Sequence, residues 1–195
     1  PLIRNTAHWK QQTVGGNAFH YKEELNVEQA TQLGTLSAFY DAKLGAKNKT
    51  TEFYCCQDLL ELQKLLGITY KIDYNARNQA VFSAVVGDKK LVLLGNANAH
   101  FDHFDTHDLW HDRLSLVVPR REVNKPVDEG CAYLYGGSWG FTWEVIFQAF
   151  NDQVAVNKKA DWLAMKETPV YFKTEHYSNS ADYIVNALLV KKIEK

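Results

Sequence analysis

The chain has 195 residues, of which 46% are hydrophobic and 23% are charged, and this composition is ordinary for a globular protein. Its 22 Lys and Arg residues are balanced by 23 Asp and Glu residues, so there is no excess of positive charge to bind the phosphates of nucleic acid. No apolar run approaches the ~18 residues that a membrane span requires. The three cysteines are too few, and odd in number, for a disulfide framework, and we expect them to be small buried residues.

Strands are expected to predominate in the first half of the chain. A helix is predicted over residues 26–44, because Asn26 can cap its start, apolar residues recur within it near helical spacing and Gly45 can end it. Gly87-Asp88 separates two strand-like runs and predicts a hairpin turn. The other elements expected here are strands at 49–56, 79–86 and 89–94 and a short helix at 58–66.

The second half is predicted to be mainly helical. Helices are expected from Thr106 to a stop near Pro119 and over residues 126–135, 143–156 and 180–192. Together the elements predict an α+β fold, with a small mixed sheet in the first half packed on an active-site helix. Because no linker or repeat is evident, we expect a single domain of residues 1–195, strand-rich to about residue 95 and helical from about residue 96.

Two histidines separated by three residues give the sharpest chemical signal. His107 and His111 lie on a predicted helix, where residues four apart are ~40° apart around the axis and about 6 Å apart along it. Both rings can therefore reach one point, which a metal ion requires of two imidazoles. Glu129 follows after 17 intervening residues, enough for a second helix to return alongside, and is the candidate third ligand. Asp108 is placed between the histidines, where a carboxylate can take a proton from a water molecule that the metal activates.

This pattern resembles the gluzincin metallopeptidases. Their motif is His-Glu-x-x-His, with a third-ligand Glu on the next helix that often reads Glu-Gly-x-Ala, and here that segment reads Glu129-Gly130-Cys131-Ala132. The specific motifs span residues 107–135, and the layout is similar over residues 48–192. The resemblance implies a zincin-like fold and a peptidase that acts on a peptide or protein substrate. It further implies a zinc cofactor bound by His107, His111 and Glu129, with Asp108 as the general base.

The resemblance also assigns roles to other segments. In gluzincins a downstream Tyr or His hydrogen-bonds the oxyanion of the tetrahedral intermediate, and Tyr177 or His176 is the candidate here. The strand at 89–94 would by resemblance be the edge strand that pairs with an extended peptide. The loop that begins at Gly136-Gly137 either shapes a wall of the cleft or is an ordinary turn. A secreted or periplasmic location is expected from the habits of the family.

The chain departs from the family pattern at Asp108, where gluzincins have Glu. Because Asp is one methylene shorter, its carboxylate would stand back by about 1 to 1.5 Å, and a misplacement of this size can lower a rate about a hundredfold. Tyr133 stands four residues after Glu129, where thermolysin-like members have an Asp that supports a metal-bound His. The Gly-x-Met-Glu-Asn motif of aminopeptidases is absent, since Met165 is the only methionine.

Three alternatives stay open at this point. A non-catalytic metal- or peptide-binding module of the same fold would account for Asp108 at the base position. A Cys-His peptidase would use the thiolate of Cys131 with His176. A metal site shifted by one turn would use His103 and His107, with Asp102 and Asp105 as further ligands; otherwise His100 and His103 line the approach to the site or are solvated.

Overall fold

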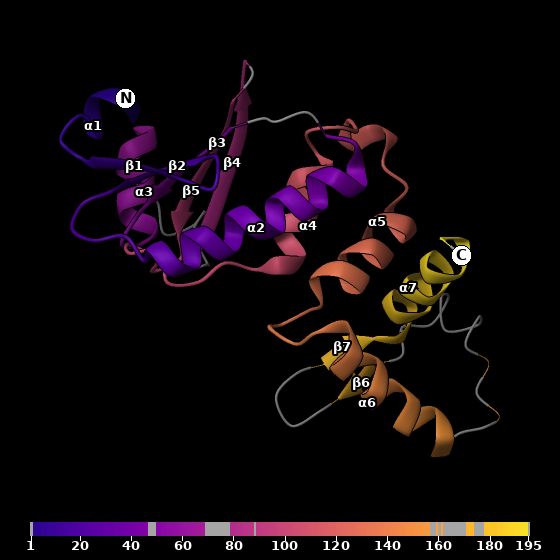
Figure 1. Cartoon of the computed structure of the whole chain (residues 1–195). Coiled ribbons are helices and arrows are strands. Elements are labelled where there is room, and N and C mark those ends of the chain that lie inside the picture. The colour runs from indigo at the N-terminus through magenta and orange to yellow at the C-terminus, as the bar shows by residue number, and fades with distance from the viewer. Residues whose placement is uncertain are drawn as a thin grey trace. The chain divides into compact units, whose positions relative to one another are not determined.

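The computed structural model in Figure 1 describes residues 2–46, 50–68, 79–87, 89–156, 159, 161, 171–173 and 178–194. The chain divides into two compact units, and the boundary lies between Phe104 and Asp105. The first unit contains a five-stranded sheet, and the second is mainly helical. The predicted α+β class is therefore confirmed.

The sheet of the first unit is mixed, as predicted, and its strand order is β1-β2-β3-β5-β4. The two inner pairings, β2 with β3 and β3 with β5, are parallel, whereas β1 pairs with β2 and β4 pairs with β5 in antiparallel fashion. The strands are β1 (Lys10–Val14), β2 (Asn17–Tyr21), β3 (Thr51–Cys55), β4 (Ala80–Val86) and β5 (Lys89–Gly95).

The prediction that the strand at 89–94 lies at the edge of the sheet is wrong. That strand, β5, pairs along its length with β3 on one side and with β4 on the other. Its side chains explain this position, because consecutive residues Val92, Leu93 and Leu94 are all buried, and only a central strand covered on both faces buries consecutive side chains. β5 therefore has no free backbone groups with which an extended peptide could pair.

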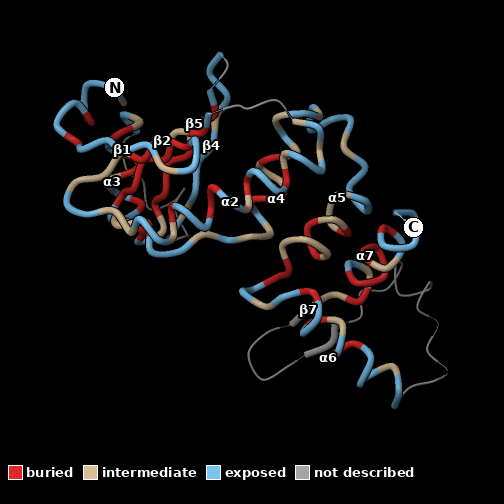
Figure 2. The backbone as a smooth tube through the Cα atoms, in the orientation of Figure 1, coloured by how far each residue is buried: buried red, intermediate tan, exposed pale blue. Residues whose placement is uncertain are grey.

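Three helices accompany this sheet: α1 (Leu2–Asn5), α2 (Val27–Leu44) and α3 (Leu59–Leu66). The Asn26 side chain accepts a hydrogen bond from Gln29 N at the start of α2, and Gly45 ends that helix with a φ of 61°. Leucines of α3 pack with Tyr54 and Leu93 on one face of the sheet. Figure 2 shows the resulting concentration of buried residues in the central strands.

The second unit is built from four main helices: α4 (Thr106–Leu114), α5 (Lys125–Cys131), α6 (Trp143–Val156) and α7 (Ala181–Ile193). Shorter elements join them: the 3-10 turn η2 (Arg120–Glu122), the π-helical segment η3 (Ala132–Gly136) and the strands β6 (Tyr171–Lys173) and β7 (Ser178–Ser180). α4 ends at Leu114, earlier than the stop predicted near Pro119, and the helix predicted over 126–135 is α5 continued by η3. A hydrophobic core of the second unit is formed by the buried side chains of Tyr133, Trp143, Ile146, Phe150, Ala181, Ile184 and Ala187.

Two glycines allow close approaches that position the candidate site. A Cβ atom on Gly130 would lie 2.7 Å from the backbone oxygen of Asn186, so glycine is required where α5 packs against α7. A Cβ atom on Gly136 would lie 2.6 Å from the backbone oxygen of Thr106, so η3 ends directly against the start of α4. Thr106 also donates its hydroxyl hydrogen to the carbonyl oxygen of Gly136. The Glu-Gly motif and the Gly136-Gly137 loop are thus explained in part by packing.

Within the described part of the chain, we find no helix that is both long and apolar enough to cross a membrane. The sheet and α4 belong to different units, so the predicted packing of the sheet on α4 stays a prediction. The single domain also stays a prediction.

Candidate metal centre

The helix α4 directs both histidines to the same side. The carboxylate of Asp105 caps α4 by accepting hydrogen bonds from the backbone N–H of His107, at 2.8 Å, and of Asp108, at 3.4 Å. The rings of His107 and His111 lie 4.8 Å apart between centroids, and their Nε2 atoms are 3.1 Å apart. The prediction that both imidazoles reach one point is confirmed.

Glu129 on α5 completes the cluster. Its Oε2 atom lies 3.4 Å from His107 Nε2 and 3.8 Å from His111 Nε2. All three side chains are half-buried. Among the described residues, this is the one group of three or more His, Cys, Asp or Glu side chains close enough to hold a metal ion. The structure thus brings together the three ligands that the sequence predicted.

The hydrogen bonds of the two rings determine which nitrogen faces the cluster. His107 Nδ1 lies 2.9 Å from the carbonyl oxygen of Gly137, and His111 Nδ1 lies 2.8 Å from a carboxylate oxygen of Asp128. Because both of these partners accept hydrogen bonds, each Nδ1 carries the hydrogen and each neutral ring keeps its lone pair on Nε2. Two lone pairs and the carboxylate of Glu129 therefore converge without a donor hydrogen among them, an arrangement that a cation stabilises.

The spacing and chemistry of these atoms fit zinc. Ligands held about 2.0 to 2.1 Å from a tetrahedral zinc ion lie about 3.4 Å from one another. The three Nε2 and Oε2 separations here are 3.1, 3.4 and 3.8 Å, so little movement is needed to bind the ion. Two imidazole nitrogens and one carboxylate oxygen form a ligand set typical of catalytic zinc sites, in which water or substrate takes the fourth position.

The electrostatics of His107 also favour a positive charge at this point. Burial alone would lower the pKa of His107, but the nearby carboxylate of Glu129, the carbonyl of Gly137 and the charge of Asp105 stabilise the protonated ring and raise that pKa above its ordinary value. The same negative groups that favour a proton on the ring favour a metal cation beside it.

Asp108 lies next to the cluster but does not belong to it. Its side chain is exposed, and the carboxylate is close enough to His107 and His111 for their charges to lower its pKa. Desolvation and the neighbouring Asp105 outweigh that effect, so the pKa of Asp108 is raised above its ordinary value. A carboxylate with a raised pKa is a stronger base, which suits the role predicted for this residue.

The surroundings of the ligands include contacts that the sequence did not predict. Asp128 accepts hydrogen bonds from His111 Nδ1 and from Trp110 Nε1, and Gly137 supports His107 through its backbone. Tyr133 is buried, and its ring stands edge-on to that of His107 at 5.2 Å. Burial raises the pKa of Tyr133 to about 12, so its hydroxyl stays protonated. In the sequence, the only local indication of the contact between Asp128 and His111 is that Asp128 directly precedes the candidate ligand Glu129 in α5.

None of the other candidate residues that the structure describes joins the cluster. Tyr177 and His176 lie outside the described residues, so their catalytic role stays a prediction, and so does the pairing of Cys131 with His176. His100 Nδ1 is 3.2 Å from the backbone oxygen of Glu24, and His103 Nε2 is 3.4 Å from Asn96 Nδ2. Asp105 is occupied in capping α4, and Asp102 Oδ1 accepts a hydrogen bond from Asn26. The described residues therefore offer no shifted metal site.

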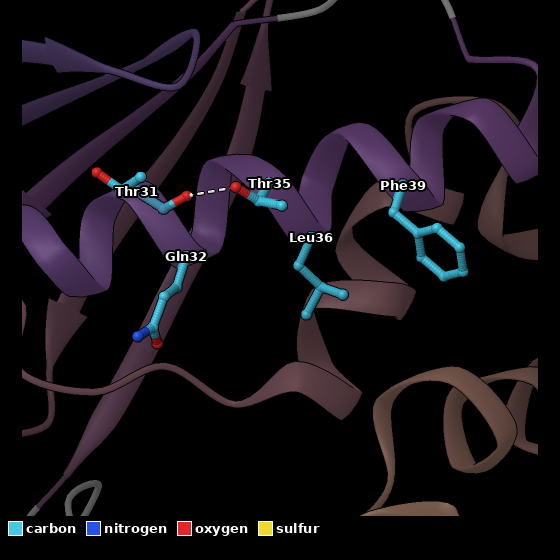
Figure 3. A pocket seen from close by; sticks show the side chains of 5 residues that line it. All are labelled: Thr31, Gln32, Thr35, Leu36 and Phe39. Atoms are coloured by element: carbon cyan, nitrogen blue, oxygen red, sulfur yellow. Dashed lines mark hydrogen bonds between the residues drawn. The ribbon is translucent and has the colours of Figure 1, made fainter.

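The other cysteines and the surface of α2 offer no competing chemistry. Burial raises the pKa of both Cys55 and Cys56 to about 12, so these thiols stay protonated. A shallow hollow on α2 is lined by neutral side chains, Thr31, Gln32, Thr35, Leu36 and Phe39 (Figure 3). The hydroxyls of Thr31 and Thr35 donate to the helix backbone, at 2.7 and 3.0 Å, so they are already engaged.

Comparisons of the chain with protein-family models, with curated proteins and with solved structures found no match. The case for a metal centre accordingly depends on the geometry of His107, His111 and Glu129.

Proposed function

We propose that this protein is a zinc-dependent, peptidase-like hydrolase of the gluzincin kind. The observation that carries the proposal is the convergence of His107 Nε2, His111 Nε2 and Glu129 Oε2, with both Nδ1 atoms already held by acceptors. This ligand set and the motif spacing resemble gluzincins, and a zincin-like fold with the sheet packed on α4 belongs to the same proposal. The substrate class is a peptide or protein.

The mechanism divides the work among the residues of the second unit. A zinc ion bound here would polarise the scissile carbonyl and lower the pKa of water. His107, His111 and Glu129 would hold that ion through their Nε2 and carboxylate atoms. Asp108 takes the proton from the attacking water at its carboxylate and delivers it to the leaving nitrogen. Tyr177 or His176 donates a hydrogen bond to the developing oxyanion. We further propose that the protein is secreted or periplasmic.

A second candidate function is a metal- or peptide-binding module that does not cleave its ligand. The observation that favours it is Asp108, which is one methylene shorter than the family's Glu and lies exposed beside the cluster. Asp108 is not among the proposed metal ligands, so a shorter base at this position would leave the ion bound while slowing hydrolysis.

Proteolysis assays on an unfolded protein and a mixed peptide library test the proposal. We expect cleavage that a chelator abolishes, that added zinc restores and that iodoacetamide leaves unchanged. Zinc binding without cleavage would establish the binding module instead. Cleavage that resists the chelator but stops with iodoacetamide would establish the Cys-His alternative and overturn the zinc mechanism.

A further inference from the structure

A single carboxylate oxygen links two side chains of α4 beside the metal cluster. Asp128 Oδ1 lies 2.8 Å from His111 Nδ1 and 3.2 Å from Trp110 Nε1. Both nitrogens donate, so the oxygen accepts two hydrogen bonds from adjacent residues of the helix that carries the histidines. The Asp128 side chain is 16% exposed and that of His111 is 27% exposed, so water competes only weakly with these contacts.

The two histidines are supported in different ways. His107 donates to the backbone carbonyl of Gly137, a neutral acceptor that no side-chain substitution removes. His111 donates to the Asp128 side chain, which carries a negative charge. The orientation of His111 therefore depends on one replaceable residue, and this asymmetry makes the contribution of Asp128 measurable.

Trp110 in turn restrains Asp128. Its side chain is buried, and its ring packs against that of Tyr135, with 5.1 Å between centroids. A buried, packed indole has little freedom to rotate, so its N–H points at a fixed place. The second hydrogen bond thus keeps the Asp128 oxygen where His111 Nδ1 can reach it.

We infer that Asp128 is the positioning residue for His111, and that Trp110 acts on the metal site only by holding Asp128. The inference rests on the proposed function, because it takes His111 to be a metal ligand. The carboxylate keeps the hydrogen on Nδ1, orients the Nε2 lone pair toward the ion and makes the imidazole a stronger donor.

Zinc affinity, measured by competition with a chromophoric chelator, tests this assignment in five variants. Asp128→Asn keeps the shape and an acceptor oxygen but removes the charge, and Asp128→Ala removes both. Trp110→Phe keeps a smaller aromatic ring and removes the donor, and a double variant combines it with Asp128→Ala. Asp152→Asn makes the same change as Asp128→Asn at an exposed carboxylate on α6 and serves as the matched control.

We expect zinc affinity to fall about 10- to 100-fold in both Asp128 variants and to stay unchanged in the control. Trp110→Phe should weaken binding by a smaller factor in the wild-type background and by none in the Asp128→Ala background, because it acts through Asp128. The visible absorption spectrum of the Co²⁺-loaded protein should shift in the Asp128 variants, since a turned imidazole alters the ligand field. Circular dichroism of the metal-free variants identifies any that fail to fold, and Asp128→Asn is the mildest change.

Two results separate this inference from the proposed function. Folded Asp128 variants that bind zinc as tightly as the wild type, with an unchanged Co²⁺ spectrum, would overturn the inference and leave the metal centre standing. Equal losses from Trp110→Phe in both backgrounds would overturn the part assigned to Trp110. A wild-type protein that binds no zinc would overturn the proposed function, and the inference with it.

Discussion

The position of one hydrogen on each imidazole decides what the candidate site can bind. Gly137 and Asp128 place those hydrogens on Nδ1, so both Nε2 lone pairs meet at Glu129. The sequence could predict the histidine pair, because residues four apart on one helix share a face whatever surrounds them. It could not predict the acceptors on Nδ1, because these depend on how α5 and the loop after η3 return to α4.

Substitutions of Asp108 distinguish between the two proposed functions, an enzyme and a binding module. Asp108→Asn should abolish cleavage while zinc stays bound, because the amide keeps the shape and loses the basicity; loss of a general base typically lowers a rate 10²- to 10⁴-fold. Asp108→Glu should preserve or raise cleavage, because it restores the longer reach of the family's residue. Initial rates on one peptide, measured with zinc content in the same samples, check both expectations.

The control for these variants is Asp152→Asn, which should change neither quantity. If Asp108→Asn cleaves at the wild-type rate, another group is the base and the assignment is wrong. If the wild type binds zinc but cleaves only after Asp108→Glu, the protein is a binding module with a disabled catalytic base.

At the scale of elements, local signals predicted the helices better than the sheet. Caps and stops are local, so α2 begins after Asn26 and ends at Gly45 as predicted, and α6 covers the predicted residues 143–156. β1 was not predicted, because its four polar residues and terminal Val14 show no apolar alternation. β2 was not predicted either. The place of β5 in the sheet could not be read from its own residues alone, because strand order depends on long-range pairing.

The close contact between η3 and α4 can be tested by a substitution at Gly136. Gly136→Ala should lower the free energy of unfolding by about 1 to 3 kcal/mol, because the new Cβ would lie 2.6 Å from Thr106 O and 2.8 Å from the Cα of His107. Zinc affinity should fall as well, since the start of α4 must move. Chemical denaturation and zinc titration measure the two effects.

Asn151→Ala, at an exposed position on α6, is the control and should change the unfolding free energy by less than about 0.5 kcal/mol. Because alanine is intrinsically about 1 kcal/mol better than glycine inside an ordinary helix, the sign of the result is informative. A Gly136→Ala variant as stable as the wild type, with unchanged zinc affinity, would show that the close approach to α4 does not constrain the site.

For the whole molecule, the three ligands and their hydrogen-bond partners all belong to residues 105–195. Zinc should therefore stabilise the second unit and leave local opening of the first unit unchanged. At zinc concentrations about 100 times the dissociation constant, linkage predicts about 2.7 kcal/mol of stabilisation, which corresponds to about 100-fold slower exchange of amides that open with the site.

Hydrogen exchange followed by mass spectrometry measures this separation directly. Peptides from α4 and α5 should exchange more slowly with zinc, and peptides from β1 to β5 should be unaffected. The same experiment on Glu129→Ala should show no effect of zinc. Protection by zinc in the sheet but not in α4 and α5 would place the metal elsewhere in the chain.

The most direct test of the metal centre is the zinc content of the purified protein, measured after reconstitution and removal of loosely bound metal. The wild type should retain one zinc ion per chain. Glu129→Ala should retain far less, while Glu122→Ala, which removes an exposed carboxylate from η2, should match the wild type. A wild-type protein without zinc, or a Glu129→Ala variant with the full wild-type content, would contradict the proposed site.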